Sequence, residues 1–194
     1  GNISLTTGGT LTNEAGTTIW AAKDLIINAA KNILNKFKAA IESKGNMTLT
    51  GESLINEAGT IKAGKNLNIN VNKLENKSNV TGSGYVQTGV FESTEKYRFQ
   101  TFPTNKYEVI KIEFPVFESN LAVTDKATIQ SGGNLSIKGK DGNNSNVTNL
   151  SGTISAKGNI DIKGDLKNET KNASMTVDEY FSKVKITLGW EERT

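Results

Sequence analysis

The chain has 194 residues, a mass of 20.9 kDa and a formal net charge of +3, which suits one domain or a segment of a repetitive protein. It contains no cysteine and no histidine, which excludes disulfides, thiol nucleophiles, imidazole bases and most zinc, copper or haem sites. Its 21 Lys and 2 Arg are scattered among 20 acidic residues, so we expect no nucleic-acid partner. The 23 Asn and 19 Gly against only 2 Pro favour many short strands and turns.

Three short motifs recur in the same order, with a period near 20 residues. The first is a polar residue followed by alternating apolar residues, and it begins at Asn2, Asp24, Asn46, Asn66, Asn134 and Asn159. The second is an apolar residue two positions before an asparagine, and its asparagines are Asn13, Asn35, Asn56, Asn76, Asn149 and Asn168. The third is a small residue followed by Ile, and its isoleucines are Ile19, Ile41, Ile61, Ile129 and Ile154. Each period therefore contains three strand-like pieces.

This period, with apolar alternation and Gly or Asn between the pieces, predicts an all-β fold: a right-handed parallel β-helix with extrahelical β-hairpin excursions. The apolar residues of the first motif would point inward and stack on their equivalents in the next coil. We expect the asparagines of the second motif to occupy corners and to exchange side-chain amide hydrogen bonds along the axis.

Residues 20–44 also fit a helix. Ala22, Leu25, Ile26, Ala29 and Ile33 lie at helical spacing, with helix-favouring Ala and Lys between them. The same residues carry all three motifs in the correct phase, however, and the other copies of the motifs show no helical periodicity. Consistency along the chain favours strands.

The repeat divides the chain into four parts. Coils occupy residues 1–76 and 127–168, an aromatic-rich excursion occupies 77–126, and a second excursion occupies 169–194. The first excursion contains 8 of the 13 aromatic residues and both prolines, so its composition differs from that of the coils. Insertions of this kind in repeat proteins lie on loops of one face.

Both excursions contain strand-like alternation. In the first, alternation on either side of a turn at residues 103–106 predicts a hairpin, and in the second Val184, Ile186, Leu188 and Trp190 alternate strictly. Both leave the coil after the second motif, so we expect them to pack together. Their apolar residues either seal the flank of the coils or form a partner-binding surface. The candidate residues for such a surface are Tyr97, Phe99, Tyr107, Phe114 and Trp190.

Residues 45–51 and 54–67 resemble the repeats of filamentous haemagglutinin and of the related contact-dependent growth inhibition proteins. The elements Asn56-Glu57-Ala58-Gly59-Thr60-Ile61 and Gly64-Lys65-Asn66-Leu67 carry the resemblance, which covers residues 1–76 and 127–168. The segment Lys36–Ala39 departs from the acidic or Gly-rich turn usual in these repeats. The resemblance implies a two-partner secretion exoprotein, exported by an outer-membrane partner to the surface of a Gram-negative cell, with a virulence role as an adhesin or a toxin-delivery stick.

We therefore expect a structural or interaction segment of a secreted surface filament, without enzymatic activity, cofactor or metal. Its expected partners are neighbouring β-helix segments of the parent chain, the secretion partner and a receptor on a host or target cell. The alternative is a carbohydrate-binding or polysaccharide-cleaving β-helix. That alternative would need aromatic residues on regular coil positions or a carboxylate cluster with a base, whereas the coils carry only Trp20 and Phe37 and isolated acids.

Overall fold

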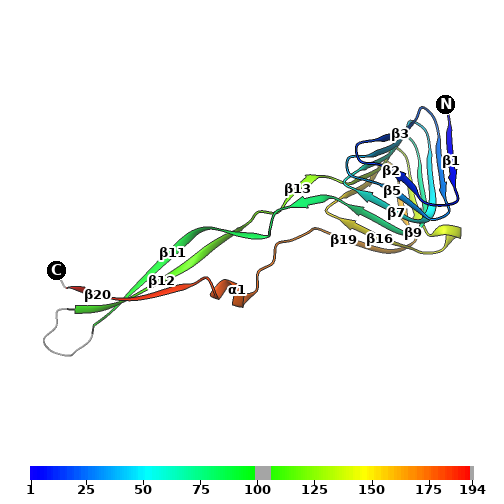
Figure 1. The fold of residues 1–194 in the computed structure, drawn as a ribbon. Helices are drawn as coiled ribbons and strands as arrows, with labels where there is room; N and C mark the ends of the chain where they lie inside the picture. Colours follow the sequence, from blue (N-terminus) through cyan, green and yellow to red (C-terminus); the bar gives the residue numbers. More distant parts are fainter. Residues whose placement is uncertain (99–105, 193–194) are drawn as a thin grey trace. The chain divides into compact units, whose positions relative to one another are not determined.

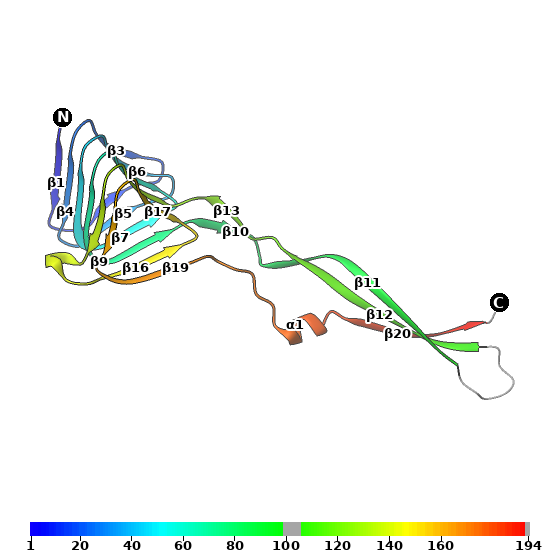
Figure 2. The same ribbon diagram turned by 180° about the vertical axis from the view of Figure 1, so that it is seen from behind.

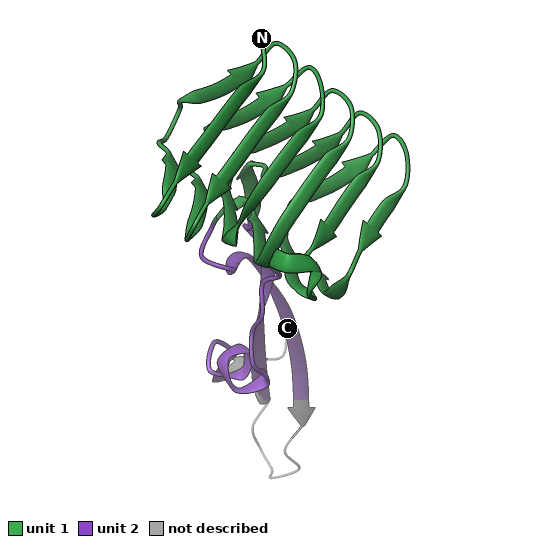
Figure 3. Ribbon diagram, turned by 90° about the vertical axis from the view of Figure 1, so that its right-hand side faces the viewer, with its two compact units in different colours: residues 1–81, 122–171 green, residues 82–121, 172–194 purple. Residues whose placement is uncertain are grey.

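The computed structural model describes residues 1–98 and 106–192, and within them the chain divides into two compact units (Figure 3). Unit 1 comprises residues 1–81 and 122–171, and unit 2 comprises residues 82–121 and 172–194. At both ends the boundary of unit 2 lies five residues inside the predicted excursion 77–126. The chain therefore leaves unit 1 and returns to it before it ends.

Unit 1 is a stack of parallel β-coils (Figures 1 and 3). The first motif forms a sheet in the order β1-β4-β7-β9-β15-β18, whose bounds are β1 (Ile3–Thr7), β4 (Leu25–Ala29), β7 (Met47–Glu57), β9 (Leu67–Lys77), β15 (Leu135–Lys138) and β18 (Ile160–Ile162). The second motif forms β2 (Leu11–Asn13), β5 (Asn32–Asn35), the second halves of β7 and β9, β16 (Ser145–Leu150) and β19 (Gly164–Glu169). A short 3₁₀ turn, η1 (Lys140–Gly142), links β15 and β16.

The third motif forms a separate five-stranded sheet in the order β17-β14-β8-β6-β3. Its strands are β3 (Thr18–Ala21), β6 (Ala40–Ser43), β8 (Thr60–Ala63), β14 (Thr128–Ser131) and β17 (Thr153–Ala156). All pairs between coils are parallel and join equivalent motif positions, as in Ile41 opposite Ile61. The predicted parallel β-helix is confirmed, and residues 20–44 form strands and not a helix.

The core is one continuous cluster of apolar side chains that stack on their equivalents in successive coils. Leu25, Met47 and Leu67 lie in register in successive coils, and each is 0% exposed. Ile3 and Leu5 in the first coil are only half-buried, because no coil covers their outer side. Each coil alone exposes its apolar face, so the stack is the unit of stability.

The corner whose sequence departs from the related repeats, Lys36–Ala39, keeps the coil shape. Lys38 there adopts a left-handed backbone with φ of 58°, and its amide donates to Ala58 O at 3.1 Å. Gly16, Ala58 and Ser151 adopt the same conformation, with φ of 73°, 47° and 52°, at the equivalent corners. In these four coils one left-handed residue therefore turns the chain at this corner.

Unit 2 is a three-stranded antiparallel sheet in the order β11-β12-β20, with one short helix, α1 (Val177–Phe181) (Figures 1 and 2). β11 (Tyr85–Arg98) and β12 (Lys106–Ser119) form the predicted hairpin, and both strands are longer than the sequence indicated. β20 (Lys185–Glu192) pairs with β12, so the two excursions pack together as expected. Among the described residues, no helix is long and apolar enough to span a membrane.

The stacked core predicts a sharp contrast between neighbouring residues of β9. Replacing Ile69, which is 0% exposed, with Asp buries a charge without a partner and should destabilise the chain by more than about 4 kcal/mol. Asn68→Asp, at the adjacent exposed position, should change stability by less than about 0.5 kcal/mol. Thermal unfolding followed by circular dichroism measures both, and equal melting temperatures would contradict the inward orientation of Ile69.

Candidate functional site

The asparagines of the second motif form a continuous ladder of side-chain amides through unit 1. Nδ2 of each donates to Oδ1 of the next, at 2.9 Å from Asn13 to Asn35, 2.8 Å from Asn35 to Asn56 and 2.8 Å from Asn56 to Asn76. The ladder continues from Asn76 to Asn149 at 2.7 Å, although 73 residues separate them in sequence. Asn149 donates to Asn168, again at 2.7 Å.

The first four ladder amides also hold the corner of their own coil and of the next one. Asn56 Nδ2 donates to Gly59 O at 2.9 Å and lies 3.3 Å from Thr128 O in the following coil. Asn35 and Asn76 make the corresponding contacts with the third motif. Asn35, Asn56 and Asn76 are 0% exposed, so these polar groups are paired inside the stack and away from water.

A second ladder lies at the start of each coil and joins side chains to the backbone. The backbone N–H of Asn46 donates to Asp24 Oδ1 at 2.7 Å, and that of Asn66 donates to Asn46 Oδ1 at 3.2 Å. In the next two coils the backbone N–H of Asn134 donates to Asn66 Oδ1 and that of Asn159 donates to Asn134 Oδ1, at 2.9 Å each. The polar residue that begins the first motif therefore fixes the rise from one coil to the next.

The first excursion leaves and re-enters the coil at one corner. Ser78 Oγ accepts a hydrogen bond from the backbone N–H of Ala127 at 2.9 Å and donates to Ser151 O at 2.7 Å. We call this junction of Ser78 and Ala127 the neck. Beyond it, β10 (Asn79–Thr81) and β13 (Ala122–Asp125) form a short antiparallel ribbon (Figure 2). Lys38 Nζ lies 3.1 Å from Asp125 Oδ1, which ties the ribbon to the neighbouring corner.

One face of the unit 2 sheet carries an apolar stripe across all three strands. Phe91 lies opposite Phe114, with ring centroids 6.4 Å apart, and Ile112 lies opposite Ile186. Ile110 is likewise opposite Leu188. Phe91, Ile186 and Leu188 are 63%, 65% and 65% exposed, so the stripe is open to solvent on both outer strands.

Of the residues predicted for a partner surface, Phe114 has a described side chain, and it lies in the apolar stripe. Tyr97, Tyr107 and Trp190 belong to β11, β12 and β20, but their side chains lie outside the described part of the structure. Phe99 lies outside the described residues.

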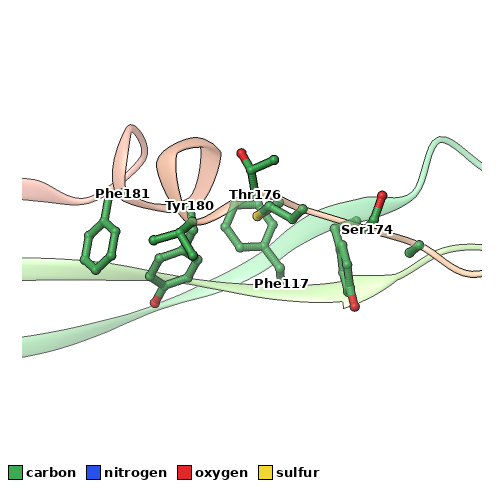
Figure 4. A pocket seen from close by; sticks show the side chains of 9 residues that line it. Phe117, Ser174, Thr176, Tyr180 and Phe181 are labelled. Atoms are coloured by element: carbon green, nitrogen blue, oxygen red, sulfur yellow. The ribbon is translucent and has the colours of Figure 1, made fainter.

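Sequence reasoning missed an aromatic groove of about 620 Å³ beside α1 (Figure 4). Phe117, Tyr180 and Phe181 form its aromatic wall, with centroids 6.1 Å apart for Phe117 and Tyr180 and 5.6 Å for Tyr180 and Phe181. Thr176 and Glu179 form a capping box that begins α1 and so fixes both aromatic residues. The spacing Thr176-x-x-Glu179 was the sequence signal for this helix.

The carboxyl groups with shifted pKa are paired or capping groups at the surface. A hydrogen bond from Lys140 lowers the pKa of Glu52, and one from Lys38 lowers that of Asp125. The backbone and side chain of Thr176 lower the pKa of Glu179. A general acid at neutral pH needs a raised pKa, so these shifts indicate structural roles. Within residues 1–98 and 106–192, no three acidic residues come close enough to hold a metal ion.

The ladder predicts that the substitution Asn56→Asp lowers the stability of unit 1. A carboxylate has the shape of the amide but donates nothing, so it would face the oxygens of Asn76 and Gly59 in a buried site. We expect the free energy of unfolding to fall by about 3 kcal/mol or more. Chemical denaturation measures it, with Asn68→Asp as the exposed control, and equal effects of the two substitutions would contradict a structural role for the ladder.

The geometry of the neck predicts that the first excursion can be deleted without unfolding the coils if Ser78 is joined directly to Ala127. Joining Ser78 directly to Ala127 gives Asn76-Lys77-Ser78-Ala127-Thr128, the same length as the intact corner Asn56-Glu57-Ala58-Gly59-Thr60. A variant lacking residues 79–126 and 172–194 should remain soluble and unfold cooperatively.

The matched control removes residues 78–126 and leaves the corner one residue short. It should melt at a distinctly lower temperature, because its corner is one residue shorter than the corner Asn56–Thr60. If both deletions unfold, or both are equally stable, the assignment of the neck is wrong.

Comparison with known proteins places these features in a family. The haemagglutinin repeat model matches residues 1–56, 40–88 and 118–169, which together make up well over half of the chain. Filamentous hemagglutinin of Bordetella pertussis (strain Tohama I) is 39% identical over 75 residues, which are 38% of this chain and 2% of that protein. The chain thus spans a small fraction of this relative's length, and no solved structure matches it. Because the repeat model matches more than half of its length, the chain belongs to the haemagglutinin repeat family.

Proposed function

We propose that the chain is a segment of a secreted filament on the outer surface of a Gram-negative bacterium. In this proposal unit 1 is a length of rigid stalk and unit 2 presents an adhesive surface to a receptor on a host or target cell. The observation that carries the proposal is the continuous asparagine ladder, which locks successive coils in register without forming a catalytic site.

The end coils support a place within a longer stack. Ile160 and Leu166 in the last coil are 48% and 53% exposed, while their equivalents Leu135 and Val147 in the preceding coil are 1% and 0% exposed. Stacking of a neighbouring coil would bury this apolar surface, at roughly 25 cal/mol per Å². Neighbouring β-helix segments of the parent chain are therefore the first partners in the proposal.

Family membership supports the route to the surface. The name of the related protein describes a filament that agglutinates red cells. For this chain we propose export by an outer-membrane secretion partner, with adhesion as the role of the filament. Delivery of a toxic domain is the other use implied by the sequence resemblance, and unit 2 would serve as a recognition surface in that case too.

Unit 2 supports adhesion because it exposes apolar and aromatic groups. Unit 2 exposes two groups of neighbouring apolar side chains, and they are not isolated residues. One is the stripe with Phe91, Ile186 and Leu188, and the other is the groove with Tyr180 and Phe181. Contiguous exposed apolar surface of this kind marks interaction sites in soluble proteins.

Agglutination of erythrocytes tests the proposal. Beads coated with the whole chain should agglutinate red cells, and beads coated with the variant lacking residues 79–126 and 172–194 should not, because that variant keeps the coils and loses unit 2. The variant is used only after its cooperative unfolding has been measured. If the whole chain and the variant agglutinate red cells equally, the adhesive surface lies on the coils and not on unit 2. If neither agglutinates them, the result contradicts an adhesive role on this cell type.

A further inference from the structure

Two carboxyl groups stand at one end of the apolar stripe of unit 2. Glu95 lies opposite Ile110 in the strand register, and Glu108 is two residues from Ile110 along β12. Opposite residues and residues two apart share a face of a sheet, so both carboxyl groups belong to the face of the stripe. Among the described side chains, neither carboxyl group has an ion-pair partner.

The two faces of the sheet differ in charge. On the face of the stripe, no side chain that the structure describes is basic. The opposite face carries Lys111 and Lys185 together with Glu92 and Glu113. A partner that covers the stripe therefore meets apolar groups and negative charge, and electrostatic complementarity requires that it bring cations.

The stripe has the dimensions of one α-helix. It crosses three strands, and two strand spacings make about 10 Å, close to the diameter of an α-helix. From Glu108 to Phe114 it extends over about 20 Å of β12, a length that an α-helix covers with about 13 residues. A sheet with one apolar face is stably covered by a packed layer of helix.

A second copy of the chain matches this face less well. Two copies placed stripe to stripe would bring both pairs of carboxyl groups into one interface, with no described base on either face to neutralise them. An anionic lipid surface would be repelled by the same groups. The charge of the face thus favours a cationic partner over these two.

We propose that the apolar stripe binds an amphipathic α-helix whose apolar face is flanked by Lys or Arg residues. This inference rests on the proposed function, in which unit 2 meets a receptor, and it specifies the chemistry of the segment that the receptor presents. Apolar side chains of the helix cover Phe91, Ile186 and Leu188, which are 63%, 65% and 65% exposed. Its cations pair with Glu95 and Glu108.

A synthetic peptide tests the class of partner. The probe has about 18 residues, with Leu at helical spacing and Lys at the remaining positions, and it carries a fluorescent label. Titration with the whole chain, followed by anisotropy, should give a Kd of about 10 μM or tighter. Binding should weaken as NaCl rises from about 0.05 M to about 0.5 M, because salt screens ion pairs.

The control peptide has Glu in place of every Lys and the same apolar face. It should bind at least about 10-fold more weakly, because it lacks cations to pair with the two carboxyl groups. Equal binding of the two peptides, or no binding of the basic one, would overturn the proposal.

A pair of double substitutions tests which face binds. Glu95→Gln with Glu108→Gln removes both carboxylates beside the stripe and should weaken binding of the basic peptide about 10-fold. Glu92→Gln with Glu113→Gln makes the same change of net charge on the opposite face and should leave the affinity unchanged. Equal weakening by both pairs would refute the assignment, since net charge alone would then account for it.

A second matched pair tests the apolar contact. Leu188→Thr removes an exposed apolar group of the stripe, whereas Val90→Thr removes one that is 48% exposed on the opposite face. Threonine favours strands, so both variants should keep their melting temperatures. Leu188→Thr should weaken binding of the basic peptide about 10-fold, and Val90→Thr should not. The reverse order would place the helix on the wrong face.

Light scattering and the agglutination assay separate the remaining outcomes. A dimer of the whole chain that Leu188→Thr abolishes would make a second copy the occupant, and binding to phosphatidylglycerol vesicles that Leu188→Thr abolishes would make it a membrane. Either result would overturn this inference. A chain that agglutinates red cells without binding the basic peptide contradicts the inference and leaves the proposed function standing. A chain that binds the peptide without agglutinating red cells supports the inference and contradicts adhesion to that cell type.

Discussion

The buried amide of the corner asparagine is the constraint on which the rest of unit 1 depends. A carboxamide that leaves water must pair both its oxygen and its N–H groups, and within a narrow stack the equivalent amide one coil away is the available partner. Asn56 accepts from Asn35 and donates to Asn76, so its position is fixed from both sides. A coil that rose by more or less than one strand spacing would break both bonds.

The residue before the third motif lies against the ladder in each coil. A Cβ at Gly59 would lie 2.5 Å from Asn35 Nδ2 and 2.8 Å from Asn56 Oδ1, so this corner is closely packed, whereas Ala39 and Ala127 stand at the equivalent position of their coils beside an unbroken ladder. The equivalent position in the first coil is Thr17, where no preceding asparagine is present in the structure, and its hydroxyl donates to Asn13 Oδ1 at 2.8 Å. The hydroxyl of Thr17 thus takes the place that a preceding asparagine amide has in the other coils.

The coils were predictable because their signal repeats. Residues 20–44 fit a helix when considered alone, but a helix would have buried none of the motif positions against those of the next coil. Unit 2 has no such repetition. The length of β11 was not evident because Glu92, Thr94 and Glu95 interrupt its apolar pattern.

Pairing partners and faces were harder to predict still. β20 could be recognised as a strand from its alternating apolar residues, but no local feature of the sequence identified β12 as its partner. The face on which Phe114 lies depended on strand parity, which follows only once the register is known.

The ladder also explains how two distant segments come to share one sheet. β12 and β20 are far apart in sequence, and closing so long a loop by chance carries a substantial entropic cost. The chain leaves unit 1 after Asn76 and again after Asn168, and only the Asn149 rung separates these two asparagines. At one strand spacing per coil, the two exits lie roughly 10 Å apart. Once the coils between them have stacked, β20 searches a small volume for β12, so the order of the coils prepares the pairing in unit 2.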